Sequence, residues 1–166
     1  WYRRQRQMCI RDSYDYSGRY QGVFPIKCNQ QRHVVEHLVE AGHRWNFGLE
    51  AGSKAELLIA LSLTRNPDAL LICNGYKDRR YIETAILARR LGHQPVVVIE
   101  QTDEVERIIA ASHDLGASPF IGIRAKLSSR STGRWGSSVG ARAKFGLDLA
   151  EMLQTVQALE KAGLLK

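Results

Sequence analysis

The stretch Gln21-Gly22-Val23-Phe24-Pro25-Ile26-Lys27-Cys28-Asn29 contains an apolar run that ends in a single lysine. We predict a short strand over residues 20–27, with Lys27 at its end. A lysine at the rim of an apolar barrel can be desolvated, which favours the neutral amine, and a neutral amine can form a Schiff base with an aldehyde. The alternative is an ordinary solvated lysine where the chain leaves the sheet. The residues alone leave both interpretations of Lys27 open.

The composition is that of one globular domain. The 166 residues are 44% hydrophobic and 25% charged, which is ordinary for a domain with its own core. No apolar run reaches the roughly 18 residues that a membrane helix needs, so we expect no membrane partner. The three cysteines, Cys9, Cys28 and Cys73, are odd in number and show no paired spacing. They indicate a reducing compartment, and we expect a cytoplasmic protein.

The positive charge is concentrated at the start of the chain. Residues 1–12 contribute +3 to the net charge of +7, which leaves +4 spread over the remainder. A basic nucleic-acid arm is one interpretation. We favour a non-native junction, because residues 1–12 show no helix or strand period and resemble translated sequencing-adapter read-through. No other part of the chain gathers basic and aromatic residues into a patch, so we expect no nucleic-acid partner and assign residues 13–166 to the folded domain.

Predicted strands and helices alternate along the rest of the chain. Strand starts recur about every 24 residues, which is the pattern of a βα repeat. The predicted strands cover residues 20–27, 45–49, 69–73, 95–99 and 119–124, and the predicted helices cover residues 31–41, 53–63, 78–91, 102–115 and 149–162.

Strands that alternate with amphipathic helices imply a parallel sheet of the α/β class. Such a sheet is either an open dinucleotide-binding sheet or part of an eight-stranded barrel. The first βα turn, residues 28–31, contains no glycine, which disfavours the dinucleotide sheet. Five strands do not close a barrel. We therefore expect a partial TIM-type (β/α)8 barrel of about five βα units, truncated before closure.

Polar side chains follow the predicted strands at the end where barrel enzymes place their active sites. Each one alone is more often an ordinary loop or capping residue. As a set they are less common, because a carboxylate beside a lysine can relay a proton and an arginine can anchor an anion. The set predicts a barrel enzyme with a lysine-centred site. Its members are Lys27, Glu50, Asn74 with Lys77 just beyond it, Glu100 and Arg124.

Five longer segments carry a family resemblance. They are residues 18–31, 48–57, 73–78, 122–127 and 144–147. Together they resemble the biosynthetic arginine decarboxylases, which are pyridoxal-phosphate enzymes with an alanine-racemase-like barrel, and the resemblance covers roughly residues 13–166. The shorter pattern Pro-x-Lys-x-Asn around Lys27 is shared by related pyridoxal-phosphate decarboxylases.

The resemblance implies a cofactor and roles for three residues. Pyridoxal 5'-phosphate is implied to be bound covalently through Lys27. Glu50 matches the acidic residue beside that lysine, and Arg124 matches an arginine near the cofactor. The implied reaction is the decarboxylation of L-arginine to agmatine and CO2, a step of polyamine biosynthesis. Mg2+ is implied by family association only, and we identify no metal-ligand set for it in the sequence.

The resemblance also implies what this chain does not contain. The family's ring-stacking histidine, phosphate loop and β-rich second domain are expected beyond residue 166, so we expect an N-terminal fragment that is inactive alone, from an enzyme that is a homo-oligomer. The alternatives are another basic-amino-acid or diaminopimelate decarboxylase and a non-catalytic pyridoxal-phosphate carrier. Ser53 and Glu56 fall in a matched segment, but a helix capping box explains them. Residues 128–141 match the family's Ser/Gly-rich segment, either a mobile lid or a long loop.

Overall fold

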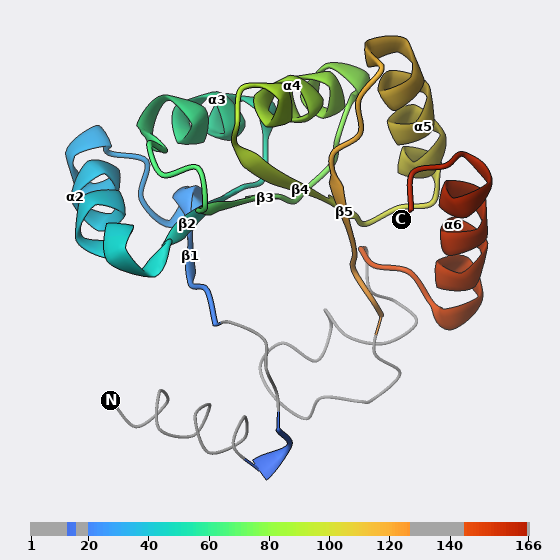
Figure 1. The fold of residues 1–166 in the computed structure, drawn as a ribbon, viewed down its shortest axis with the longest axis horizontal. Coiled ribbons are helices and arrows are strands. Elements are labelled where there is room, and N and C mark those ends of the chain that lie inside the picture. Colours follow the sequence, from blue (N-terminus) through green and yellow to red (C-terminus); the bar gives the residue numbers. More distant parts are fainter. Residues whose placement is uncertain (1–12, 16–19, 127–144, 166) are drawn as a thin grey trace.

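The computed structural model describes residues 13–15, 20–126 and 145–165 (Figure 1). Its described residues contain one parallel sheet in which each strand pairs with the next along the chain, in the order β1-β2-β3-β4-β5. β1 and β5 are the two edges of this sheet. The strands are β1 (Val23–Pro25), β2 (Gly48–Ala51), β3 (Leu70–Cys73), β4 (Gln94–Ile99) and β5 (Phe120–Ile123).

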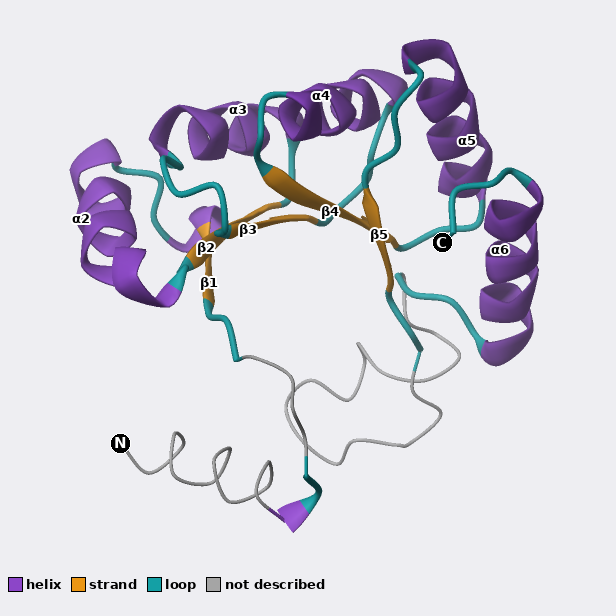
Figure 2. Cartoon of the chain, in the orientation of Figure 1, coloured by secondary structure: helices purple, strands orange, loops and turns teal. Residues whose placement is uncertain are grey.

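A helix follows every strand, and the helices form an arc around the outside of the curved sheet (Figure 2). This alternation confirms the predicted α/β class and the partial barrel. The helices are α2 (Arg32–Gly42), α3 (Lys54–Leu63), α4 (Arg79–Arg90), α5 (Asp103–Leu115) and α6 (Leu149–Lys161), with two short 3-10 helices, η1 (Ile26–Cys28) and η2 (His43–Trp45).

The hydrophobic core lies between the sheet and the helices. Along β4 burial alternates, so that Val97 and Ile99 are fully buried while Val96 and Val98 are only partly covered. Val97 and Ile99 belong to the same buried cluster as side chains from the helices, including Ile108 of α5. Burial of these side chains on one face supplies the main driving force for the fold. The other face, which carries Val98, is left to line the inside of the barrel.

The first strand is shorter than predicted. We predicted a strand through Lys27, but β1 ends at Pro25 and Lys27 lies in the 3-10 helix η1. The amide of Asn29 donates to the carbonyl oxygen of Ile26 at 3.0 Å and closes the turn. Ile26 is fully buried, so the chain leaves the sheet in a turn that places this side chain in the core.

The second strand begins later than predicted. Residues 45–49 were the predicted strand, whereas β2 starts at Gly48 and Trp45 ends the 3-10 helix η2. Asn46 follows it in the left-handed conformation, with φ of 53°. Asparagine tolerates this conformation better than most residues, and it turns the chain before the strand can start.

Side-chain caps begin α3 and α4, and the cap at Ser53 confirms the sequence prediction. Ser53 accepts a hydrogen bond from the amide of Glu56 at 3.3 Å and caps α3. Asp78 accepts one from the amide of Tyr81 at 2.7 Å and caps α4. The start of α5 has no side-chain cap, because Thr102 already has helical backbone angles and its side chain makes no capping bond.

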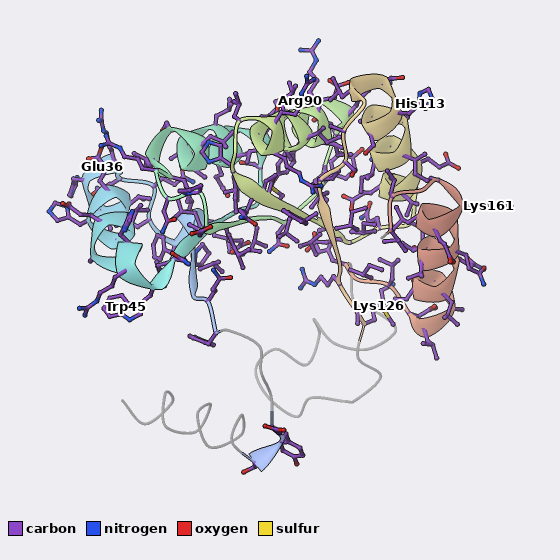
Figure 3. The ribbon with its side chains drawn as sticks, in the orientation of Figure 1. Glu36, Trp45, Arg90, His113, Lys126 and Lys161 are labelled. Carbon is purple, nitrogen blue, oxygen red and sulfur yellow. The ribbon has the colours of Figure 1, made fainter. Side chains whose placement is uncertain are left out.

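Several polar side chains of the outer surface lie on separate helices. Figure 3 shows Glu36, Arg90, His113 and Lys161 pointing outward from α2, α4, α5 and α6. In the described part of the chain, no helix has the length and apolar character needed to cross a membrane. The predicted junction at residues 1–12 and the predicted Ser/Gly-rich loop at residues 128–141 lie outside the described residues.

Candidate active site

A cleft of about 630 Å³ lies at the carboxyl ends of the strands. This volume falls in the range of about 300–1,000 Å³ that is typical of small-molecule and cofactor sites. The structure brings five of the six predicted polar residues together in it, because parallel strands all end at the same rim. The cleft is lined by Lys27, Glu50, Gly52, Glu56, Asn74, Gly75, Val98, Glu100, Arg124 and Phe145.

The lysine side of the cleft holds an amine beside a carboxylate. Lys27 Nζ lies 3.8 Å from Glu50 Oε1. Asn74 Nδ2 donates a hydrogen bond to the same oxygen at 3.1 Å and so orients the carboxylate. The amide of Asn74 donates to the carbonyl oxygen of Ala51 at 2.8 Å, which ties the ends of β2 and β3 together. A carboxylate held in this way can accept or return a proton at the amine.

Of the two interpretations that the sequence leaves open, the Lys27 side chain fits the solvated lysine in this structure. It is 66% exposed, whereas the Glu50 side chain is 13% exposed. The reason lies in its position, because η1 carries Lys27 off the end of the edge strand β1, and β1 pairs with β2 alone in the described residues. The amine is therefore accessible to a ligand from the cleft.

The arginine side of the cleft holds a tighter ion pair. Arg124 Nη1 donates to Glu100 Oε1 at 2.6 Å, and the Glu100 side chain is only 2% exposed. The amide of Gly146 donates to the carbonyl oxygen of Glu100 at 2.9 Å, and the amide of Leu147 donates to that of Arg124 at 2.7 Å. The segment around residue 146 thus packs against both residues and fixes the backbone on this side of the cleft.

Lys77 is the predicted rim residue that the structure removes from the cleft. Its side chain is fully buried, and its Nζ lies 3.0 Å from Glu104 Oε1, which is also fully buried. Sequence reasoning missed Glu104, because an acidic residue in the first turn of a helix such as α5 is common and needs no partner. A buried carboxylate is rare unless it is paired, and no local pattern shows that its partner lies 27 residues earlier.

Glu56 is a cleft residue that the capping interpretation set aside. Its carboxylate lines the cleft, and its Oε2 accepts a hydrogen bond from the amide of Gly52 at 2.7 Å. This is half of a capping box displaced by one residue, because the backbone partner is Gly52 and not Ser53. Its place in a matched family segment was the signal that could have found it.

The floor beneath the lysine side is supported by a buried tyrosine. Tyr81 OH donates to the carbonyl oxygens of Ala51 at 2.8 Å and of Asn74 at 3.3 Å. Burial raises the pKa of Tyr81, so the hydroxyl stays protonated and available as a donor. Burial also raises the pKa of the neighbouring Cys73 thiol to about 12, which excludes this cysteine as a nucleophile near neutral pH.

Two glycines allow the loops after β2 and β3 to meet at the cleft. Gly75 has φ of +76°, and a Cβ atom there would lie 2.2 Å from the carbonyl oxygen of Gly52. A residue with a side chain in place of Gly75 would be strained at this φ angle, and its Cβ atom would push the two loops apart. Among the described residues, no group of three or more His, Cys, Asp and Glu side chains could hold a metal ion.

Fold and cleft together define an α/β-barrel domain with a lysine and a carboxylate at the carboxyl ends of its strands. The family described as "Pyridoxal-dependent decarboxylase, pyridoxal binding domain" matches residues 3–166. The chain belongs to this family.

Curated relatives agree with the resemblance found in the sequence. The chain is 78% identical over 152 residues to the biosynthetic arginine decarboxylase of Parasynechococcus marenigrum (strain WH8102), a match that covers 92% of the chain and 24% of the relative. It is 76% identical over 152 residues to the protein of that name from Prochlorococcus marinus (strain MIT 9303), with the same coverage. The chain therefore spans about a quarter of the length of the curated relatives it matches.

Solved structures confirm the fold. The biosynthetic arginine decarboxylase of Campylobacter jejuni matches 93% of the chain and 24% of its own, with a TM-score of 0.80 and 36% identity. The diaminopimelate decarboxylase of M. jannaschi matches 95% of the chain and 34% of its own, with a TM-score of 0.71 and 20% identity. At this lower identity the likeness shows the barrel fold alone.

Proposed function

We propose that the protein to which this chain belongs decarboxylates L-arginine to agmatine and CO2, with pyridoxal 5'-phosphate bound covalently at Lys27. The observation that carries the proposal is the accessible Lys27 amine 3.8 Å from the Glu50 carboxylate, at a cleft of a pyridoxal-dependent decarboxylase domain. Relatives named biosynthetic arginine decarboxylase at 78% and 76% identity support arginine as the substrate. The step belongs to polyamine biosynthesis.

The residues present fit the cofactor. A primary amine that is 66% exposed can reach an aldehyde in the cleft, and the cleft has the volume of a cofactor site. Lys27 would hold the cofactor covalently at the β1 edge of the sheet, and Arg124 would contact it from the β5 edge of the same cleft. When bound, the cofactor supplies an electron sink for the pair of electrons left when the substrate carboxylate departs as CO2.

The chain's own residues move and place protons. Glu50 Oε1 is the nearest acid to the Lys27 amine, so it accepts a proton from Nζ as the amine becomes a nucleophile and can return it later. Asn74 holds Glu50 Oε1 by a hydrogen bond of 3.1 Å and so keeps the acceptor beside the amine. Glu100 holds the Arg124 guanidinium at the cleft through a contact of 2.6 Å.

Further parts of the proposal concern the whole protein. We propose that residues 13–166 form the N-terminal part of the barrel domain, that the protein is a homo-oligomer in the cytoplasm, and that Mg2+ is tied to it by family association alone. We expect the 166-residue chain by itself to produce no agmatine. The five strands of the described residues leave the barrel open, and the cleft that they form lacks the walls that further strands would add.

The test uses a chimaera of the Parasynechococcus marenigrum relative. In it, the 152 matching residues of this chain replace the corresponding residues of the relative. We expect the chimaera to release agmatine and CO2 from arginine, and Lys27→Ala to lower kcat by at least roughly a thousandfold and to abolish covalent cofactor binding. Lys54→Ala is the matched control, since Lys54 is a partly exposed lysine that pairs with Asp78 at 3.4 Å. Agmatine formation by Lys27→Ala at the parental rate would overturn the proposal.

A further inference from the structure

We infer that the buried Lys77–Glu104 pair is a positioning device for Arg124, which it controls through Glu100. Neither Lys77 nor Glu104 lines the cleft, and both side chains are fully buried. The inference rests on the proposed function, because it assigns these two residues to the cofactor side of that site.

The first link joins the pair to the end of β4. Glu104 Oε1 forms an ion pair with Lys77 Nζ at 3.0 Å and accepts a hydrogen bond from the backbone amide of Lys77 at 3.1 Å. Glu104 Oε2 accepts one from the amide of Glu100 at 2.9 Å. One carboxylate therefore connects the loop after β3 to the residue that follows β4, and it fixes the backbone of Glu100 with a charge-assisted hydrogen bond.

The second link joins Glu100 to the cleft. Its carboxylate accepts from Arg124 Nη1 at 2.6 Å, while its carbonyl oxygen accepts from the amide of Gly146 at 2.9 Å. The Arg124 side chain is 54% exposed, so a long and flexible side chain depends on Glu100 for its direction. Displacement of the Glu100 backbone would therefore move the guanidinium in the cleft.

An apolar pair could fill the space of Lys77 and Glu104, and buried ion pairs are often replaced in this way without loss of stability. An apolar pair could not accept hydrogen bonds from the amides of Lys77 and Glu100. Glu104 accepts both of them, one with each carboxylate oxygen. The carboxylate is thus needed for the position of the rim and not only for the packing of the core.

The test is a double-mutant cycle in the chimaera, measured as the Kd for pyridoxal 5'-phosphate when the apo form is titrated with it. We expect Glu104→Gln to weaken binding about tenfold or more when Arg124 is present, a size typical for residues that orient a ligand-binding group. In the Arg124→Gln background we expect Glu104→Gln to change the Kd less than about twofold, because its effect passes through Arg124. Equal fold-changes in both backgrounds would overturn the inference.

A second readout follows the apo form without any cofactor. We expect Glu104→Gln to speed hydrogen exchange at the backbone amides of Glu100 and Gly146. The first donates to Glu104 and the second to the carbonyl oxygen of Glu100. Ile108→Ala is the matched control, since Ile108 is a fully buried residue of the same helix. It should lower stability and leave the Kd unchanged. A rise in the Kd for Ile108→Ala as large as that for Glu104→Gln would show that general loss of stability is sufficient.

Failure of this inference and failure of the proposed function give different results. If the unmutated apo chimaera does not bind pyridoxal phosphate through Lys27, the proposed function fails. If it binds and the cycle shows no coupling, only the positioning role fails. Where Glu104→Gln does not fold, Lys77→Met/Glu104→Gln takes its place, because it leaves no unpaired charge and still removes the carboxylate. The same Kd pattern is expected, and its absence contradicts the inference.

Discussion

Two ion pairs line the same cleft, and they differ in how firmly the protein holds them. Lys27 and Glu50 are 3.8 Å apart, and the lysine is 66% exposed. Arg124 and Glu100 are 2.6 Å apart, and the Glu100 carboxylate is almost completely buried. The lysine is free to reach a ligand, whereas the arginine is held by the Glu100 carboxylate. The backbone amide of Glu100 in turn donates a hydrogen bond to Glu104.

The difference indicates a division of work within the cleft. A group that must form and break a covalent bond needs access and a nearby proton acceptor, and Lys27 has both. A group that only orients a ligand works best when it is already in place before binding. The structure satisfies the second need with buried charges, whose replacement should affect stability far more than replacement of Lys27.

The largest effect on stability is expected for Lys77→Met. Removal of one partner from a buried pair leaves Glu104 charged and unpaired, and we expect the free energy of unfolding to fall by about 3–5 kcal/mol. Urea unfolding of the chain followed by circular dichroism measures it. Arg79→Met is the control, because Arg79 pairs with Glu83 and Asp114 on the surface. A loss below about 1 kcal/mol for Lys77→Met would contradict the contrast between the two pairs.

A smaller loss is expected for Arg124→Gln. This change leaves the buried Glu100 carboxylate without its cation, and hydrogen bonds to charged groups contribute about 1.5–3 kcal/mol. The same unfolding measurement applies. Glu100→Gln/Arg124→Gln should lose less than Arg124→Gln alone, since it leaves no buried charge. If the double variant is the less stable of the two, the buried and unpaired Glu100 charge is not the cause of the stability lost in Arg124→Gln.

The rim of the cleft was predictable because topology alone determines it. Parallel strands joined by outer helices all end on one side, so polar residues after the strands had to converge, and Glu50, Asn74, Glu100 and Arg124 do so with Lys27. The alternation of apolar segments was sufficient to predict which strands and helices form. The errors at the ends of β1 and β2 came from single turns, which the apolar pattern does not mark.

The support beneath the rim was not predictable in the same way. Lys77 stands only three residues after Asn74, and the left-handed turn at Gly75 sends it inward to Glu104. Glu104 meets the requirements of a helix first turn, so its sequence position already had a sufficient explanation. Contacts between residues far apart in the sequence leave no local period, and a single sequence does not reveal them.

Next in size is the effect of Tyr81→Phe on the lysine side. The hydroxyl donates to the carbonyl oxygens of Ala51 and Asn74, and its loss leaves these acceptors without that donor. We expect a loss of about 1 kcal/mol in the free energy of unfolding. Tyr20→Phe, at an exposed tyrosine, is the control and should change nothing measurable. A Tyr81→Phe chain as stable as the unmutated one would mean that the carbonyls find other donors.

The smallest effect on stability is expected for Lys27→Ala. An ion pair at 3.8 Å whose lysine is 66% exposed contributes between about 0 and 1 kcal/mol, and salt weakens it. At high salt we expect the urea midpoint of Lys27→Ala to coincide with that of the unmutated chain. The control Lys54→Ala should show the same midpoint. A loss above about 2 kcal/mol would place Lys27 among the structural residues. If the midpoints coincide while the chimaera loses cofactor binding, the lysine serves chemistry alone, and the loose pair and the held pair have separate functions.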